Sequence, residues 1–108
     1  MKVDIIQLEF IHILLRRLMI ELERSWGEWV VTSLFRMNDS GVHGTLPLRA
    51  IDLSCKNILL GRMVKKWIND RWVYDKIRPW KEVCKFHDVG EGWHLHIQVH
   101  PNTYGKII

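Results

Sequence analysis

The stretch from Trp93 to Val99 constrains the fold of this chain more than any other feature, because its side chains alternate in character. Apolar residues hold the odd positions, and His94, His96 and Gln98 hold the even ones. Alternation with a period of two indicates a β-strand, so the two histidines are expected to project from one face. Two imidazoles on a rigid strand suit a metal ion, and a polar sheet face without a metal is the alternative.

The remaining pattern predicts a single α+β domain over residues 1–108, with a mostly antiparallel sheet packed with two helices. Apolar residues at helical spacing predict helices over 5–25 and about 56–69, with Ser54 as the N-cap of the second helix. The tail after Tyr104 is expected to be loose. Runs of β-branched and aromatic residues predict strands over 29–33, 49–53, 71–74, 82–88 and 93–99, the last two joined as a hairpin.

Composition adds weaker constraints. Lys and Arg exceed Asp and Glu by 16 − 12 = 4, which favours contact with an anionic polymer such as cell wall or nucleic acid. Without a recognised nucleic-acid motif, no specific nucleic-acid partner is expected. Neither a membrane span nor a signal peptide is expected from the sequence. Cys55 and Cys84 are expected to be buried thiols, with a disulfide between them as the alternative.

Three segments carry residues that could hold a metal ion together. His43 lies in a loop before the strand that carries Asp52, and His94 and His96 lie on a later strand. One carboxylate and two imidazoles leave an open position on a tetrahedral zinc ion, which is the pattern of a catalytic site. Such an ion acidifies a bound water and polarises a carbonyl group.

Other residues could supply the remaining chemistry. Glu91 and His94 are the candidates to take the proton of the water and deliver it to a leaving amine. Arg36 could hold a substrate carboxylate or stabilise a developing oxyanion. His87 is expected to be a solvated surface histidine.

These segments resemble a known family. The run 31–36 is similar to the strand-plus-arginine segment of the zinc D-Ala-D-Ala carboxypeptidase and L-alanyl-D-glutamate peptidase family, typically T-S-G-Y-R. Residues 40–52 resemble its S-x-H-x-x-G-x-A-x-D motif, and 91–96 resemble its closing E-x-W-H or H-x-H motif. Together the matches span about 29–100, the expected metal-site core. The resemblance implies a hedgehog-type zinc peptidase fold.

The resemblance also implies a ligand set, in which Zn²⁺ is held by His43, Asp52 and one histidine of the closing motif. In the E-x-W-H alignment Glu91 is the base and His94 the ligand. In the H-x-H alignment, which fits over more positions, His96 is the ligand and His94 lies beside the metal as a catalytic group. Eight residues separate His43 from Asp52, more than is usual in the family, so residues 44–48 are expected to bulge.

The function that the resemblance implies is a zinc-dependent peptidase that cleaves the peptide stems of peptidoglycan, as a carboxypeptidase or an endopeptidase. Members include phage endolysins, so synthesis in a cytoplasm and action at the cell wall or in a phage particle are expected. The alternative is a non-catalytic zinc-containing binding or structural module of the same fold, associated with a phage.

Overall fold

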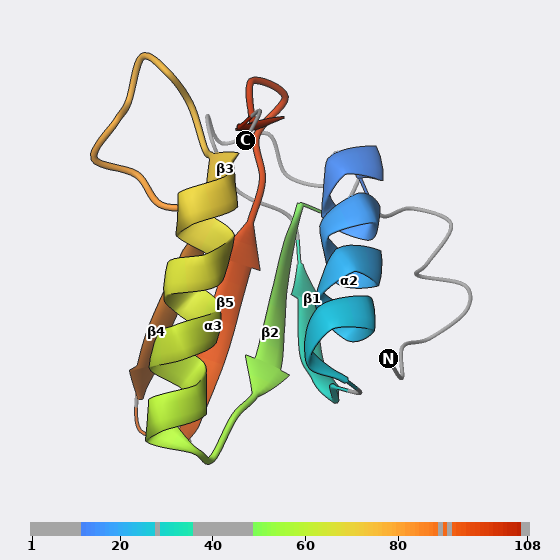
Figure 1. Cartoon of the computed structure of the whole chain (residues 1–108), viewed down its shortest axis with the longest axis vertical. Helices are drawn as coiled ribbons and strands as arrows, with labels where there is room; N and C mark the ends of the chain where they lie inside the picture. The colour runs from blue at the N-terminus through green and yellow to red at the C-terminus, as the bar shows by residue number, and fades with distance from the viewer. Residues whose placement is uncertain (1–11, 28, 36–48, 89, 91, 107–108) are drawn as a thin grey trace.

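An antiparallel sheet with two helices packed on it forms this α+β domain, as the sequence predicts (Figure 1). The computed structural model describes residues 12–27, 29–35, 49–88, 90 and 92–106, with the backbone alone for 33–35. The four strands lie in the spatial order β1-β2-β5-β4, and every neighbouring pair is antiparallel. They are β1 Val31–Phe35, β2 Ala50–Ser54, β4 Cys84–Asp88 and β5 Trp93–Gln98.

The two central strands, β2 and β5, build the sheet's share of the core. Ile51 pairs with Ile97 and Leu53 with Leu95, and all four side chains are fully buried. They belong to one apolar cluster with residues of both helices. Since alternate residues point to opposite faces, the helices must cover the face that carries these four side chains. The intervening polar residues of β2 and β5 therefore face away from the helices.

The first helix, α2, runs from Ile13 to Trp26 and buries Leu15, Leu18 and Leu22 against the sheet. His12 caps its N-terminus, because its Nδ1 accepts a hydrogen bond from the Leu14 N–H at 3.1 Å. The structure confirms the predicted helix over 13–25, and residues 5–11 of that prediction lie outside the described part. Neither helix in the described ranges has the length and apolarity needed to cross a membrane.

The second helix, α3, runs from Ile58 to Arg71, and its start differs from the prediction. Ser54 does not cap it, because Ser54 is the last residue of β2 and pairs with His94. Asn57 is the cap instead, and its side-chain oxygen accepts from the Leu60 N–H at 3.0 Å. The strand therefore runs further than expected and the helix begins two residues later.

The predicted hairpin of β4 and β5 is confirmed, with His87 opposite His94 and Asp88 opposite Trp93. The Asp88 carboxylate accepts hydrogen bonds from the N–H groups of Gly90 and Gly92, at 2.9 and 3.2 Å. Both glycines have a φ of 100°, a conformation that other residues rarely adopt. The turn is therefore closed by one carboxylate and two glycines.

The described part of the C-terminal tail, Gly105 and Lys106, is not loose, contrary to the prediction, and residues 107–108 lie outside the described residues. Tyr104–Gly105 forms β6, which pairs with β3, Trp72–Val73, in a second sheet of two strands. The Lys106 N–H donates to the Arg71 carbonyl at 2.7 Å and extends this pairing. The prediction failed because so short a strand has no periodic signal of its own and forms only against its partner.

Candidate functional site

The polar face of the sheet brings together two predicted metal ligands and one predicted catalytic residue. Asp52 of β2 lies directly opposite His96 of β5 in the strand register. The His96 Nδ1 is 2.8 Å from the Asp52 Oδ1, and the His94 Nε2 is 4.0 Å from the same oxygen. The three side chains are only 14–20% exposed. A carboxylate this shielded from water needs partners, and the two imidazoles supply them.

His87 of β4 joins this group, although it was expected to be solvated. Its Nε2 is 3.1 Å from the His94 Nε2, and its ring centroid is 4.7 Å from that of His94. Partial burial lowers the pKa of His87, and the neighbouring His94 and His96 lower it further. We refer to Asp52, His87, His94 and His96 as the His–Asp cluster.

The surroundings of His94 fix its tautomer. Its Nδ1 lies 3.2 Å from the Gly92 carbonyl oxygen, which can only accept, so Nδ1 carries the proton of the neutral ring. The Nε2 then holds a lone pair, and His87 is oriented to donate to it. The atom of His94 that points at the other cluster members is therefore basic.

His96 is held from both sides. Its Nδ1 faces the Asp52 carboxylate, and its Nε2 lies 3.2 Å from the Gln98 Oε1. The amide of Gln98 is itself fixed, because its Nε2 donates to the Glu82 carbonyl at 2.9 Å. Both ring nitrogens of His96 thus lie within hydrogen-bond distance of oxygen acceptors.

The cluster has the donor chemistry of a zinc site without its full geometry. One carboxylate and neutral imidazoles are the ligands that zinc prefers, and two ligands of one tetrahedral ion lie roughly 3.3 Å apart. The proposed ligand atoms His96 Nδ1 and Asp52 Oδ1, 2.8 Å apart, are closer than that separation. Within the described ranges, no three His, Cys, Asp or Glu side chains are arranged to hold a metal ion.

Three of the predicted site residues lie outside the described residues: Arg36, His43 and Glu91. The bulge expected over 44–48 lies outside them too. The third expected ligand, His43, is therefore still a prediction, as are the roles of Glu91 and Arg36. The structure does place Asp52, His94 and His96 together, as the sequence analysis expected.

The two cysteines take no part in the cluster. Both are free and buried, so the expectation of buried thiols is confirmed over the alternative disulfide. Burial raises the pKa of Cys84 to about 12. Its thiol therefore stays protonated near neutral pH, and the thiolate that a metal would need does not form.

Comparison with protein-family models, with curated proteins and with solved structures found no match to this chain.

Proposed function

We propose that this protein is a zinc-dependent peptidase that cleaves the peptide stems of peptidoglycan. The observation that carries the proposal is the register of β2 and β5, in which Asp52 lies beside His96, with His94 on the same face. The sequence motifs assign ligand roles to Asp52 and His96 and a catalytic role to His94. Residues 44 positions apart in the sequence thus lie side by side on one face of the sheet, which supports the proposal.

In this proposal Asp52, His96 and His43 hold the zinc ion. When bound, the ion would polarise the scissile carbonyl and acidify a water molecule. We propose His94 as the base, because its Nε2 lone pair points into the cluster and its Nδ1–H is anchored on Gly92. The Asp52 carboxylate lies 4.0 Å from that Nε2. His87, donating to that Nε2, orients the ring in the resting state.

The alternative is a non-catalytic module of the same fold. The observation that favours it is the environment of His96, whose two nitrogens both face acceptors. A histidine that donates a hydrogen bond from each of its two nitrogens has no lone pair left to bind a metal. The network then only holds β2 and β5 together through polar contacts. The two functions differ in metal content and in turnover.

The test begins with the zinc content of the purified protein and of the variants Asp52→Asn and His96→Ala. We expect about one zinc ion per chain in the wild type and almost none in either variant. His100→Asn is the matched control, because this histidine lies outside the cluster and should leave the zinc content unchanged. The zinc-loaded protein is then incubated with muropeptides, and the products are identified by mass spectrometry.

Cleavage of a stem peptide by the wild type, lost in Asp52→Asn, would support the peptidase. Bound zinc without cleavage of any muropeptide would keep the metal site and reject the peptidase. A protein that takes up no zinc at all would reject the metal site and favour the non-catalytic module, whose polar contacts between β2 and β5 need no metal.

A further inference from the structure

The connection between β3 and β4 contains only basic and apolar residues over 76–81, in the order Lys-Ile-Arg-Pro-Trp-Lys. We refer to this segment as the 76–81 loop, and the connection that carries it projects beyond the end of α3 (Figure 1). Ile77 is 79% exposed and Trp80 is 72% exposed. Single apolar residues are common on protein surfaces, but two large ones within four positions, both flanked by cations, indicate a surface that binds a partner.

Neighbouring groups fix the conformation of the 76–81 loop. Asp75 is 4% exposed, and its carboxylate accepts hydrogen bonds from the Ile77 N–H and from the Arg78 Nε–H, each at 3.0 Å. The Lys81 N–H donates to the Arg78 carbonyl oxygen at 3.0 Å and closes a turn around Trp80. The loop therefore presents its apolar side chains in a defined conformation, which reduces the ordering cost of binding.

The charge of the loop is positive. Lys76, Arg78 and Lys81 carry three positive charges and Asp75 offsets one of them, which leaves a net charge of 3 − 1 = +2. Arg78 and Lys81 lie 5.4 and 5.7 Å from the centroid of the Tyr74 ring, and Lys76 is exposed. Cations on a surface of this kind favour an anionic partner.

The β3–β6 sheet brings similar groups to the same end of the molecule. Tyr104 is 44% exposed and pairs with Val73, two residues before Asp75. Lys106 is exposed, and its backbone N–H is bonded to the Arg71 carbonyl oxygen. Tyrosine and tryptophan favour the boundary between lipid and water, because each has an apolar ring and a polar atom.

This combination favours a lipid surface over a nucleic acid. Single-stranded nucleic acids are bound by cations and by aromatic rings that stack on the bases. Ile77 cannot stack on a base, yet it is more exposed than Trp80. At an anionic bilayer, an aliphatic side chain and an indole both gain by leaving water, while the cations meet the phosphate groups. A lipid surface thus accounts for both exposed apolar side chains.

We propose that the 76–81 loop binds an anionic phospholipid surface, with Trp80 and Ile77 entering the headgroup region and Lys76, Arg78 and Lys81 facing the phosphates. Binding of this kind is peripheral, since the apolar side chains reach only the boundary of the acyl chains. The inference does not depend on the proposed peptidase function, because the loop contains no member of the His–Asp cluster.

The experiment measures cosedimentation of the full-length protein with vesicles of phosphatidylcholine and phosphatidylglycerol in equal parts, and with vesicles of phosphatidylcholine alone. We expect binding to the anionic vesicles only, and weaker binding as salt is added. Trp80→Ala should weaken binding about tenfold and Ile77→Ala several-fold, because each removes apolar area that leaves water. Lys76→Gln should weaken it about fivefold, because it removes one cation near the surface.

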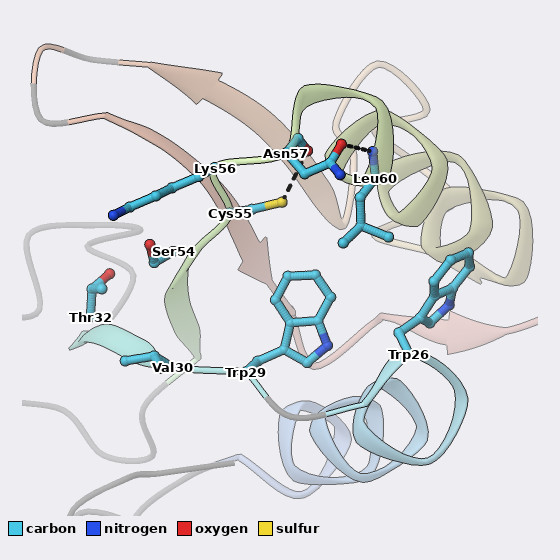
Figure 2. A pocket seen from close by; sticks show the side chains of 9 residues that line it. All are labelled: Trp26, Trp29, Val30, Thr32, Ser54, Cys55, Lys56, Asn57 and Leu60. Atoms are coloured by element: carbon cyan, nitrogen blue, oxygen red, sulfur yellow. Dashed lines mark hydrogen bonds between the residues drawn. The ribbon is translucent and has the colours of Figure 1, made fainter.

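The matched control variants lie at the opposite end of α3. Leu59 is 70% exposed in the first turn of the helix, and Lys56 is exposed directly before the Asn57 cap (Figure 2). The 14 residues of α3 separate this end from the loop by about 20 Å, roughly twice the Debye length at about 0.1 M salt. Leu59→Ala and Lys56→Gln should therefore leave vesicle binding unchanged.

Tryptophan fluorescence distinguishes insertion from adsorption by charge alone. Lipids brominated in their acyl chains quench an indole that reaches the acyl boundary, so we expect quenching in the wild type. Trp80→Phe should still bind and lose that quenching. Binding without quenching, or equal binding by Ile77→Ala and Leu59→Ala, would overturn the proposal. A single-stranded oligonucleotide is tested in parallel, and binding to it in place of the vesicles would assign the loop to nucleic acid instead.

Discussion

His12 shows how a single residue can make the stability of this domain depend on pH. Burial lowers its pKa, and the nearby Arg49 and His100 lower it further. Below its ordinary pKa of about 6.5, the unfolded chain takes up a proton that the folded chain resists. The contribution of His12 is therefore complete above that pH and is lost as the pH falls toward the folded pKa. Protonation would also add a proton to the Nδ1 that accepts from Leu14.

We expect His12→Asn to reduce this acid sensitivity, because asparagine is a good N-cap and does not titrate. The measurement is the free energy of unfolding in urea at about pH 7.5 and about pH 5.5 for both proteins. The loss between the two pH values should be smaller in the variant. An equal loss in both proteins would assign the sensitivity to other groups.

At the scale of single residues, the sequence predicts part of the cluster. Alternation in β5 puts His94 and His96 on one face, and the family resemblance implies that Asp52 is a zinc ligand together with one of them. The predicted pairing of 82–88 with 93–99 already sets His87 opposite His94, so that pairing was the signal that could have identified His87. The carboxylate–imidazole contact itself needs the register of β2 against β5, and no local pattern encodes a pairing across 44 residues.

Helix α3 contains a glycine that propensity alone would replace. Gly61 is buried in the second turn, and a Cβ built on it would overlap the ring of Phe86 on β4. Phe86 is held in turn by Trp93, with ring centroids 4.9 Å apart. Alanine would gain about 1 kcal/mol of helix propensity, but the overlap would cost about 1–3 kcal/mol.

We therefore expect Gly61→Ala to lower the free energy of unfolding, measured in urea. The double variant Gly61→Ala, Phe86→Leu should show less than the sum of the two single losses, because the smaller side chain relieves the overlap. Additive losses would contradict this, because they would show that the Phe86 ring does not clash with a side chain at position 61. From the sequence alone, Gly61 is expected only to weaken the helix. The reason for a glycine at this position is the Phe86 ring on β4, which the helix sequence does not encode.

For the whole molecule, the small β3–β6 sheet ties the C-terminus to the end of α3. Trp72 is 5% exposed, with its indole N–H 3.3 Å from Glu21 of α2 and Gly105 as its strand partner.

We expect a chain ending at Thr103 to lose roughly 1–3 kcal/mol of unfolding free energy, because it loses these pairings and uncovers part of the Trp72 ring. A chain ending at Lys106 keeps these pairings and is the control against which the loss is measured. Urea unfolding of the three proteins decides this, and equal stabilities would contradict it.

The α+β class, the antiparallel sheet and the two helices could be predicted because each has a long periodic signal. The spatial order β1-β2-β5-β4 could not be predicted, because β2 pairs with β5 across a long stretch of sequence and no local pattern encodes that pairing.

The register of the central strands also sets an order for folding. His87, His94 and His96 all lie in one hairpin, whose turn is closed within a few residues by Asp88. Local hairpins form in roughly 1–10 microseconds, whereas pairing of distant strands carries a larger loop-closure cost and is slower. We therefore expect the three imidazoles to gather early and Asp52 to arrive only when β2 docks between β1 and β5. Formation of the Asp52–His96 contact would then mark one of the last steps by which the nascent chain becomes native.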